Sequence, residues 1–279
     1  MIIANPIYDT TFKMLMQDNE SAKFLVGTIL DCEVISLVES TKERTFFHED
    51  SSRVTPFLMD FAATIRTEDG ETKKVLIELQ KSQHYIDIAR FRKYLGSEYV
   101  YSDLPIITIY ILGFNLESES PAFKTTSECV DLITNEKLEV RDHFVKQLTH
   151  TAYFIQIKRI KPEYNTKLEK LLSIFEQANF LDNTSKRFKG IELIDIESGL
   201  NRVVNRLNLI AADKDAREKL ENEEYYQLHL EAIYGKESRK AMQLDSKLME
   251  AAKELKKMGA DTDTIAKITE LSIEEIEKL

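Results

Sequence analysis

The sequence contains little cysteine, proline or glycine. Only two cysteines occur among the 279 residues, and Cys32 and Cys129 lie far apart. This spacing matches neither a zinc site nor a disulfide framework, so we interpret both residues as free thiols of a reducing compartment. The five prolines and eight glycines are few for this length. Their scarcity argues against long low-complexity linkers.

Long apolar runs are also absent. No stretch reaches the roughly 20 apolar residues that span a bilayer. The first residues do not combine a basic region with a long apolar run, as a signal peptide does. The five histidines are dispersed, without the spacing of a histidine metal site, and no phosphate-binding glycine motif occurs. These absences predict a cytoplasmic protein with no membrane partner.

The chain has no excess of positive charge, since its formal net charge is −10. Phosphate binding normally requires a basic face, so this balance counts against nucleic-acid binding. Metal-dependent nucleases nevertheless need acidic clusters, and net charge does not describe local patches. The basic clusters at 158–161 and 186–189 are interpreted as solvated.

Hydrophobic residues make up 43% of the chain, which is enough for a sizeable core. Periodicity, turn residues and β-branched content predict a mixed first part, with helices at 12–30 and 85–101 and strands or β-leaning segments at 34–48, 57–67, 74–80, 105–114 and 151–160. Residues 129–140 are predicted to form a hairpin with Asn135 near its turn. Asp9 or Thr10 is the expected cap of the first helix. Helices are predicted for the rest, at 164–179, 198–211, 213–234, 237–258, 263–270 and 272–279.

This change of character predicts three parts. Residues 1–180 form an α/β domain, residues 181–240 a helical extension, and residues 241–279 a set of C-terminal helices. Gly259 is expected to end one helix, and Ser272 with Glu275 matches a capping box that starts the last one.

The strands at 57–67 and 74–80 carry the main chemical signal. The turn residues Glu68-Asp69-Gly70 predict that they form a hairpin. Apolar side chains alternate along them, at Phe61, Ala63 and Ile65 and at Val75, Ile77 and Leu79. Both apolar sets must lie on one face, because a slip of one residue would expose one set to water. Asp60 then shares the other face with Glu78 and Gln80, roughly opposite one of them.

Two carboxylates held close repel each other unless a cation lies between them. Mg²⁺ prefers oxygen ligands, and it can activate water and stabilise charge on a phosphodiester. The alternative interpretation is that Asp60 and Glu78 are solvated residues on an exposed sheet face. A carboxylate within the apolar segment FLMDFAA favours the functional interpretation.

Asp60 followed by Glu78-Leu79-Gln80 after a hairpin resembles the motif of the PD-(D/E)XK nucleases. The likeness is greatest to the branch of PD-(D/E)XK transposases related to the recombination-promoting nucleases, in which glutamine often replaces the motif lysine. The segments 8–13, 88–94 and 98–99 and the carboxyl end, IAKITELSIEEIEKL, are similar to further stretches of that family. The resemblance covers roughly residues 5–180 and the tail.

The resemblance implies a restriction-endonuclease-like mixed sheet core flanked by helices, with an α-helical C-terminal extension. It also implies DNA cleavage, with Mg²⁺ (or Mn²⁺) held by Asp60, Glu78 and the carbonyl of Leu79. Gln80 can hydrogen-bond a water but brings no positive charge. Lys13 or Lys81 could supply that charge, and Lys13 is preferred because strand alternation directs Lys81 to the opposite face. For Lys13, an exposed lysine on a helix is the plainer interpretation.

The segment after the motif offers Arg90, Arg92 and Tyr94. Arginine can bind phosphate and tyrosine can stack on bases, so these three residues are predicted to contact DNA. A solvated helix face is the alternative.

The last helix carries Glu274, Glu275 and Glu277, which repel phosphate, so the tail is predicted to serve an interaction such as homodimerisation. The leading functional hypothesis is a DNA endonuclease of recombination or transposase type. The rivals are a catalytically weak or inactive relative that binds DNA or protein, and a structural helical protein.

Overall fold

The computed structural model describes most of the chain, in the ranges 1–39, 57–67, 70–82, 91–92, 95–96, 99, 104–138, 150–161, 165–182, 184–191, 198–269 and 271–277. Within these ranges only the backbone is described at 57–60, 78, 82, 230–242, 245 and 274.

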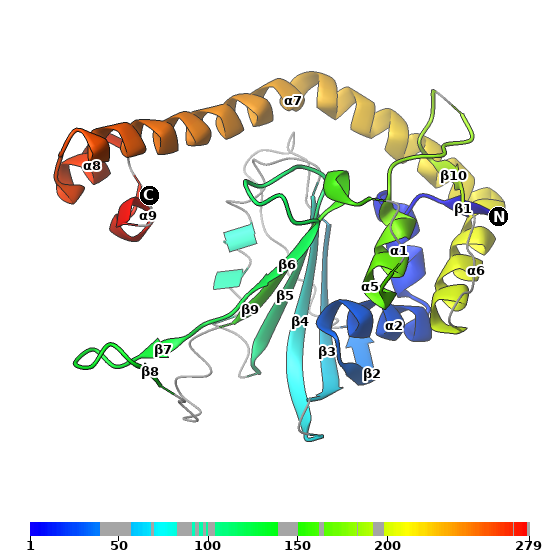
Figure 1. Ribbon diagram of the computed structural model, residues 1–279. Coiled ribbons are helices and arrows are strands. Elements are labelled where there is room, and N and C mark those ends of the chain that lie inside the picture. The colour runs from blue at the N-terminus through cyan, green and yellow to red at the C-terminus, as the bar shows by residue number, and fades with distance from the viewer. Residues whose placement is uncertain are drawn as a thin grey trace.

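A mixed six-stranded sheet lies at the centre of the protein, with strand order β2-β3-β4-β5-β9-β6 (Figure 1). Its strands are β2 (Glu33–Glu39), β3 (Phe57–Arg66), β4 (Thr72–Ser82), β5 (Ile106–Leu112), β6 (Ala122–Thr125) and β9 (Thr151–Gln156). The pairs β4–β5 and β5–β9 are parallel, and the other neighbouring pairs are antiparallel. An antiparallel hairpin therefore continues into a parallel centre.

The burial of β5 explains why its sequence is almost entirely apolar. Ile109 and Ile111 belong to the main hydrophobic core on one face of the sheet. Tyr110 and Leu112 belong to a smaller core on the other face, together with Phe91. A strand that is covered on both faces needs no polar alternation.

Helices pack against the face of the sheet that carries the main hydrophobic core, and Figure 1 shows them next to the sheet. They are α1 (Asp9–Met16), α2 (Asn19–Leu30), α5 (Lys167–Leu172) and α6 (Ser198–Ala212). The buried side of α6 follows helical spacing, with Leu200, Val203, Val204, Leu207, Ile210 and Ala211. A two-stranded sheet of β1 (Ile2–Ala4) and β10 (Phe188–Gly190) lies next to α6.

The single helix predicted over 12–30 is wrong, because the chain forms α1 and α2 there. Asp18 separates them with an extended backbone, and its side chain accepts hydrogen bonds from Ser21 N at 3.1 Å and Ser21 Oγ at 2.6 Å. An aspartate that caps a new helix outweighs the apolar periodicity that runs across it. Asp9 is the first residue of α1 rather than its cap.

The helices predicted at 213–234 and 237–258 form one continuous helix, α7 (Lys214–Lys257), so the break between them is wrong. Figure 1 shows α7 extending past the end of the sheet and carrying α8 (Thr262–Thr269) and α9 (Ile273–Glu277) away from it. Gly259 has φ +82° after α7, as expected of a helix end. The predicted capping box is also confirmed, since Ser272 N donates to Glu275 Oε2 at 2.8 Å and Glu275 N donates to Ser272 Oγ at 3.3 Å.

The predicted strands β3, β4, β5 and β9 are confirmed, and so is a hairpin of β7 (Cys129–Val130) and β8 (Lys137–Leu138). Prediction missed β1, β6 and β10, which are too short to show a periodic pattern. The helix predicted at 164–179 is reduced to α5 and a short 3₁₀ helix, η3 (Ser173–Phe175), and a second, η2 (Ile157–Arg159), follows β9. Of the predicted helix at 85–101, the structure describes residues 91, 92, 95, 96 and 99, and all five are helical. Of the β-leaning segment 34–48, it describes residues 34–39, which lie in β2. The other residues of both segments lie outside the described residues.

The protein is thus of the mixed α/β class, with a mixed sheet flanked by helices and followed by C-terminal helices. Among the helices that the structure describes, none has the length and apolar character to cross a membrane.

Candidate metal site

The hairpin of β3 and β4 pairs Asp60 directly with Glu78. Gln80, two residues further on, pairs with Leu58. This register confirms the prediction that Asp60 and Glu78 occupy the same face of the sheet. The buried residues Phe61 and Ile77 pair on the opposite face, in the main core. The side chains of Asp60 and Glu78 lie outside the described residues, so the site is defined here by backbone position.

Directly paired residues of antiparallel strands hold their Cβ atoms about 5 Å apart. Two carboxylates attached at this separation repel each other when both are ionised. A divalent cation between them removes the repulsion, and carboxylate oxygen is the donor that Mg²⁺ prefers. The donor chemistry at positions 60 and 78 therefore fits a magnesium ion.

Strand β5 adds two residues to this face of the sheet, next to Glu78 and Gln80. Glu78 pairs with Thr108, and Gln80 pairs with Tyr110. Gln80 is 1% exposed and Thr108 is 0% exposed. Polar side chains are thus enclosed next to the paired acidic positions, which is unusual for the inner strands of a sheet.

Aromatic side chains cover the neighbouring part of the same face. The rings of Tyr110 and Phe154 stack with centroids 5.0 Å apart, and Phe123 stacks on Phe154 at the same distance. Phe91 approaches Tyr110 at 5.3 Å. This aromatic cluster keeps water from one side of positions 60 and 78. Electrostatic interactions next to the cluster are therefore stronger than they would be in water.

Lys81 follows Gln80 but lies on the main-core face, as strand alternation predicts. Its side chain is 3% exposed, and its ammonium forms an ion pair with Asp9 Oδ1 at 2.6 Å. It also donates a hydrogen bond to the carbonyl of Ile7 and lies 5.6 Å from the ring centroid of Phe12. Lys81 therefore fastens the start of α1 to β4, one residue beyond the candidate motif.

Helix α7 holds the same start of α1. The carboxylate of Glu223 accepts hydrogen bonds from the backbone N–H groups of Asp9 at 2.5 Å and Thr10 at 2.9 Å. These donors are the unpaired N–H groups of the first turn, so Glu223 supplies the cap that α1 lacks in its own sequence. No local sequence signal could identify a cap from a residue over 200 positions away.

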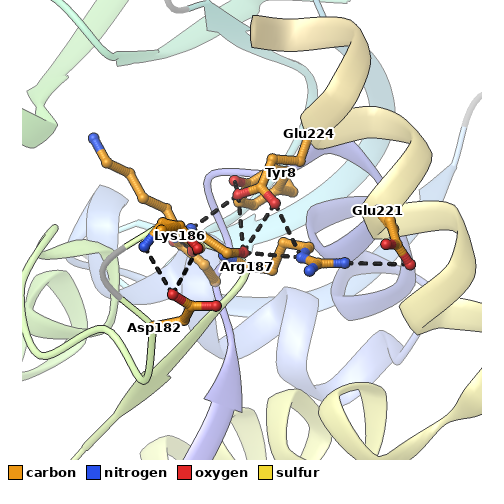
Figure 2. A network of polar contacts seen from close by, with 9 residues as sticks. Tyr8, Asp182, Lys186, Arg187, Glu221 and Glu224 are labelled. Atoms are coloured by element: carbon orange, nitrogen blue, oxygen red, sulfur yellow. Dashed lines mark hydrogen bonds and ion pairs between the residues drawn. The ribbon is translucent and has the colours of Figure 1, made fainter.

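Glu224 extends this attachment, and Figure 2 shows Tyr8, Lys186 and Arg187 gathered around it. Its carboxylate accepts from Tyr8 Oη at 2.7 Å, from Lys186 N at 2.9 Å and from Arg187 Nε at 3.0 Å. Burial, and then the hydrogen bond to Glu224, raise the pKa of the Tyr8 phenol well above its usual range. The raised pKa keeps the phenol protonated, and thus a donor to Glu224, at alkaline pH values where an ordinary tyrosine ionises.

The other predicted site residues occupy varied places. Leu79 is fully buried on β4, so only its backbone is available to a ligand. Lys13 is exposed on α1, and α1 packs on the sheet face opposite to positions 60 and 78. The structure therefore does not place Lys13 next to those two positions. Arg92 is exposed, whereas Arg90 and Tyr94 lie outside the described residues.

Among the residues that the structure describes with side chains, no group of three or more histidine, cysteine, aspartate or glutamate residues is placed to hold a metal ion. A scan against protein-family models matched none, and searches of curated proteins and of solved structures also returned no match.

Proposed function

We propose that the protein is a Mg²⁺-dependent endonuclease that hydrolyses phosphodiester bonds in DNA, of the PD-(D/E)XK type. The observation that carries this proposal is the direct pairing of Asp60 with Glu78 at the centre of the sheet. A restriction-endonuclease-like core is the proposed fold type, and the mixed sheet flanked by helices supports it.

In this proposal Asp60, Glu78 and the carbonyl of Leu79 hold the metal ion. Mg²⁺ bound there would supply a Lewis acid that lowers the pKa of a bound water and offsets charge on the phosphodiester. The amide of Gln80 orients the attacking water by hydrogen bonding. Arg92, with Arg90 and Tyr94, contacts the DNA backbone and bases. The role of Lys13 as a source of positive charge stays a prediction, and Mn²⁺ is expected to replace Mg²⁺.

Cleavage of supercoiled plasmid DNA with and without Mg²⁺ tests the proposal. We expect Asp60→Ala and Glu78→Gln to reduce the cleavage rate more than about 100-fold, because each removes the negative charge that holds an ion contributing several kcal/mol to the transition state. Glu39→Gln, an exposed carboxylate at the end of the adjacent strand β2, is the matched control and should cleave at the wild-type rate.

Equal cleavage by the wild type and both site variants would refute the proposal. A wild-type protein that retards DNA in a gel without cleaving it would instead support the alternative, a catalytically weak or inactive DNA-binding relative. The proposed homodimer through the C-terminal helices is a separate prediction, which the gel assay does not address.

A further inference from the structure

The hydroxyl group of Thr108 is buried on β5. Its side chain is 0% exposed, and no described residue hydrogen-bonds to its Oγ1. A buried hydroxyl that makes no hydrogen bond costs free energy relative to water. Valine has the same shape and suits a strand equally well, so stability alone does not explain a threonine here.

The position of Thr108 indicates which group the hydroxyl can serve. Thr108 lies on β5 between Glu78 of β4 and Ala152 of β9, which are its register partners. Because β5 pairs with strands on both sides, the main-chain acceptors nearby are used in the sheet. Ala152 has only a methyl group. Glu78 is therefore the one register partner whose side chain can accept a hydrogen bond from Thr108.

We propose that Thr108 is a positioning residue of the metal site, which donates a hydrogen bond to the Glu78 carboxylate when that carboxylate binds Mg²⁺. This inference rests on the proposed function. A metal-binding carboxylate keeps lone pairs that are not used by the metal, and a fixed donor to one of them sets its orientation. Since Thr108 is enclosed, water cannot replace its hydroxyl when the side chain is changed.

Titration of the full-length protein with Mg²⁺, followed by the shift in melting temperature, tests the proposal. We expect Thr108→Val to weaken Mg²⁺ binding about 10- to 100-fold, the usual effect of removing a hydrogen bond to a metal ligand. Thr108→Ser keeps the hydroxyl and should bind as the wild type does. Thr28→Val is the matched control, because Thr28 on α2 is also buried with an unpartnered hydroxyl among the described residues.

Wild-type Mg²⁺ affinity in Thr108→Val would overturn the proposal. A raised melting temperature of that metal-free variant would then identify Thr108 as a simple buried polar group. If Thr108→Val does not fold, Thr108→Ala replaces it, and equal Mg²⁺ affinity of the alanine and serine variants would overturn the proposal. The variant Asp60→Ala distinguishes a failure of the role of Thr108 from a failure of the metal site. Loss of binding in Asp60→Ala with full binding in Thr108→Val refutes the role of Thr108 alone, whereas unchanged binding in Asp60→Ala, or no binding by the wild type, refutes the metal site itself.

Discussion

Lys189 on β10 is a buried lysine whose ammonium group serves main-chain carbonyls. It is 3% exposed and donates to the carbonyl oxygens of Ser173 at 3.4 Å, Ile174 at 3.3 Å and Glu176. These carbonyls end the α5–η3 segment, so a cation there also opposes the helix dipole. Burial lowers the pKa of Lys189 from 10.5 to about 8. The interpretation of 186–189 as a solvated cluster is therefore wrong at Lys189.

This pKa shift predicts a specific dependence of stability on pH. The unfolded chain binds the Lys189 proton more tightly than the folded protein does, so the free energy of unfolding should rise as pH increases from about 8 towards 10.5. The full rise attributable to this residue is about 3 kcal/mol. Urea denaturation at several pH values measures it.

The variant Lys189→Met isolates this effect, because its free energy of unfolding should not rise between pH values of about 8 and 10.5. Lys158→Met, at an exposed lysine, should keep the wild-type profile. Parallel profiles for the wild type and Lys189→Met would contradict the prediction.

At the scale of elements, α1 is held from outside its own sequence. Lys81 of β4 binds Asp9, while Glu223 of α7 caps the backbone of the same turn. Glu224 joins Tyr8 to the segment around Arg187 (Figure 2). The start of α7 is thereby a structural part of the α/β core.

We expect Glu224→Ala to lower the free energy of unfolding by about 2–4 kcal/mol, because it leaves Tyr8 and Arg187 partly buried without their acceptor. Equilibrium denaturation in urea gives the value. Glu221→Ala is the matched control, since Glu221 lies one turn earlier, pairs with the same arginine at 3.6 Å and is 73% exposed. That variant should change stability little, because exposed ion pairs contribute little. Equal losses in the two variants would argue against the docking role of Glu224.

On the scale of the whole molecule, α7 connects two separate hydrophobic cores. Ala216 and Leu220, near its start, are buried in the main core. Near its end, Ala252 is buried with Ile265 of α8 and Ile276 of α9. After Leu220, α7 leaves the main core, and Tyr225 is 76% exposed.

This arrangement predicts different effects of two truncations. A chain ending at residue 228 keeps the turns of α7 that are buried in the main core. Its melting temperature should be close to that of the full-length protein. A chain ending at residue 212 loses Ala216, Leu220 and both glutamates that hold α1, so it should be strongly destabilised or unfolded. Thermal melts followed by circular dichroism test both. Unfolding of the longer chain would contradict the prediction.

The same truncation tests the predicted dimer. Leu244, Met258, Ile268 and Ile273 are exposed on the C-terminal helices. If these helices mediate self-association, sedimentation velocity should show the full-length protein as a dimer and the chain ending at residue 228 as a monomer. A monomeric full-length protein would refute it.

The sequence by itself determined the β3–β4 hairpin and the pairing parity of Asp60 with Glu78, because strand alternation and turn residues act over a few positions. The cap at Ser272 is local in the same sense.

Only the tertiary structure decided that Thr108 lies beside Glu78, that α7 is continuous, and that Glu223 caps α1. Each depends on which strands and helices come together across long stretches of chain, and hydrophobic burial rather than local preference selects those partners. For the same reason Lys189, an ordinary lysine in a basic cluster of the sequence, became a buried cation at the end of a helix.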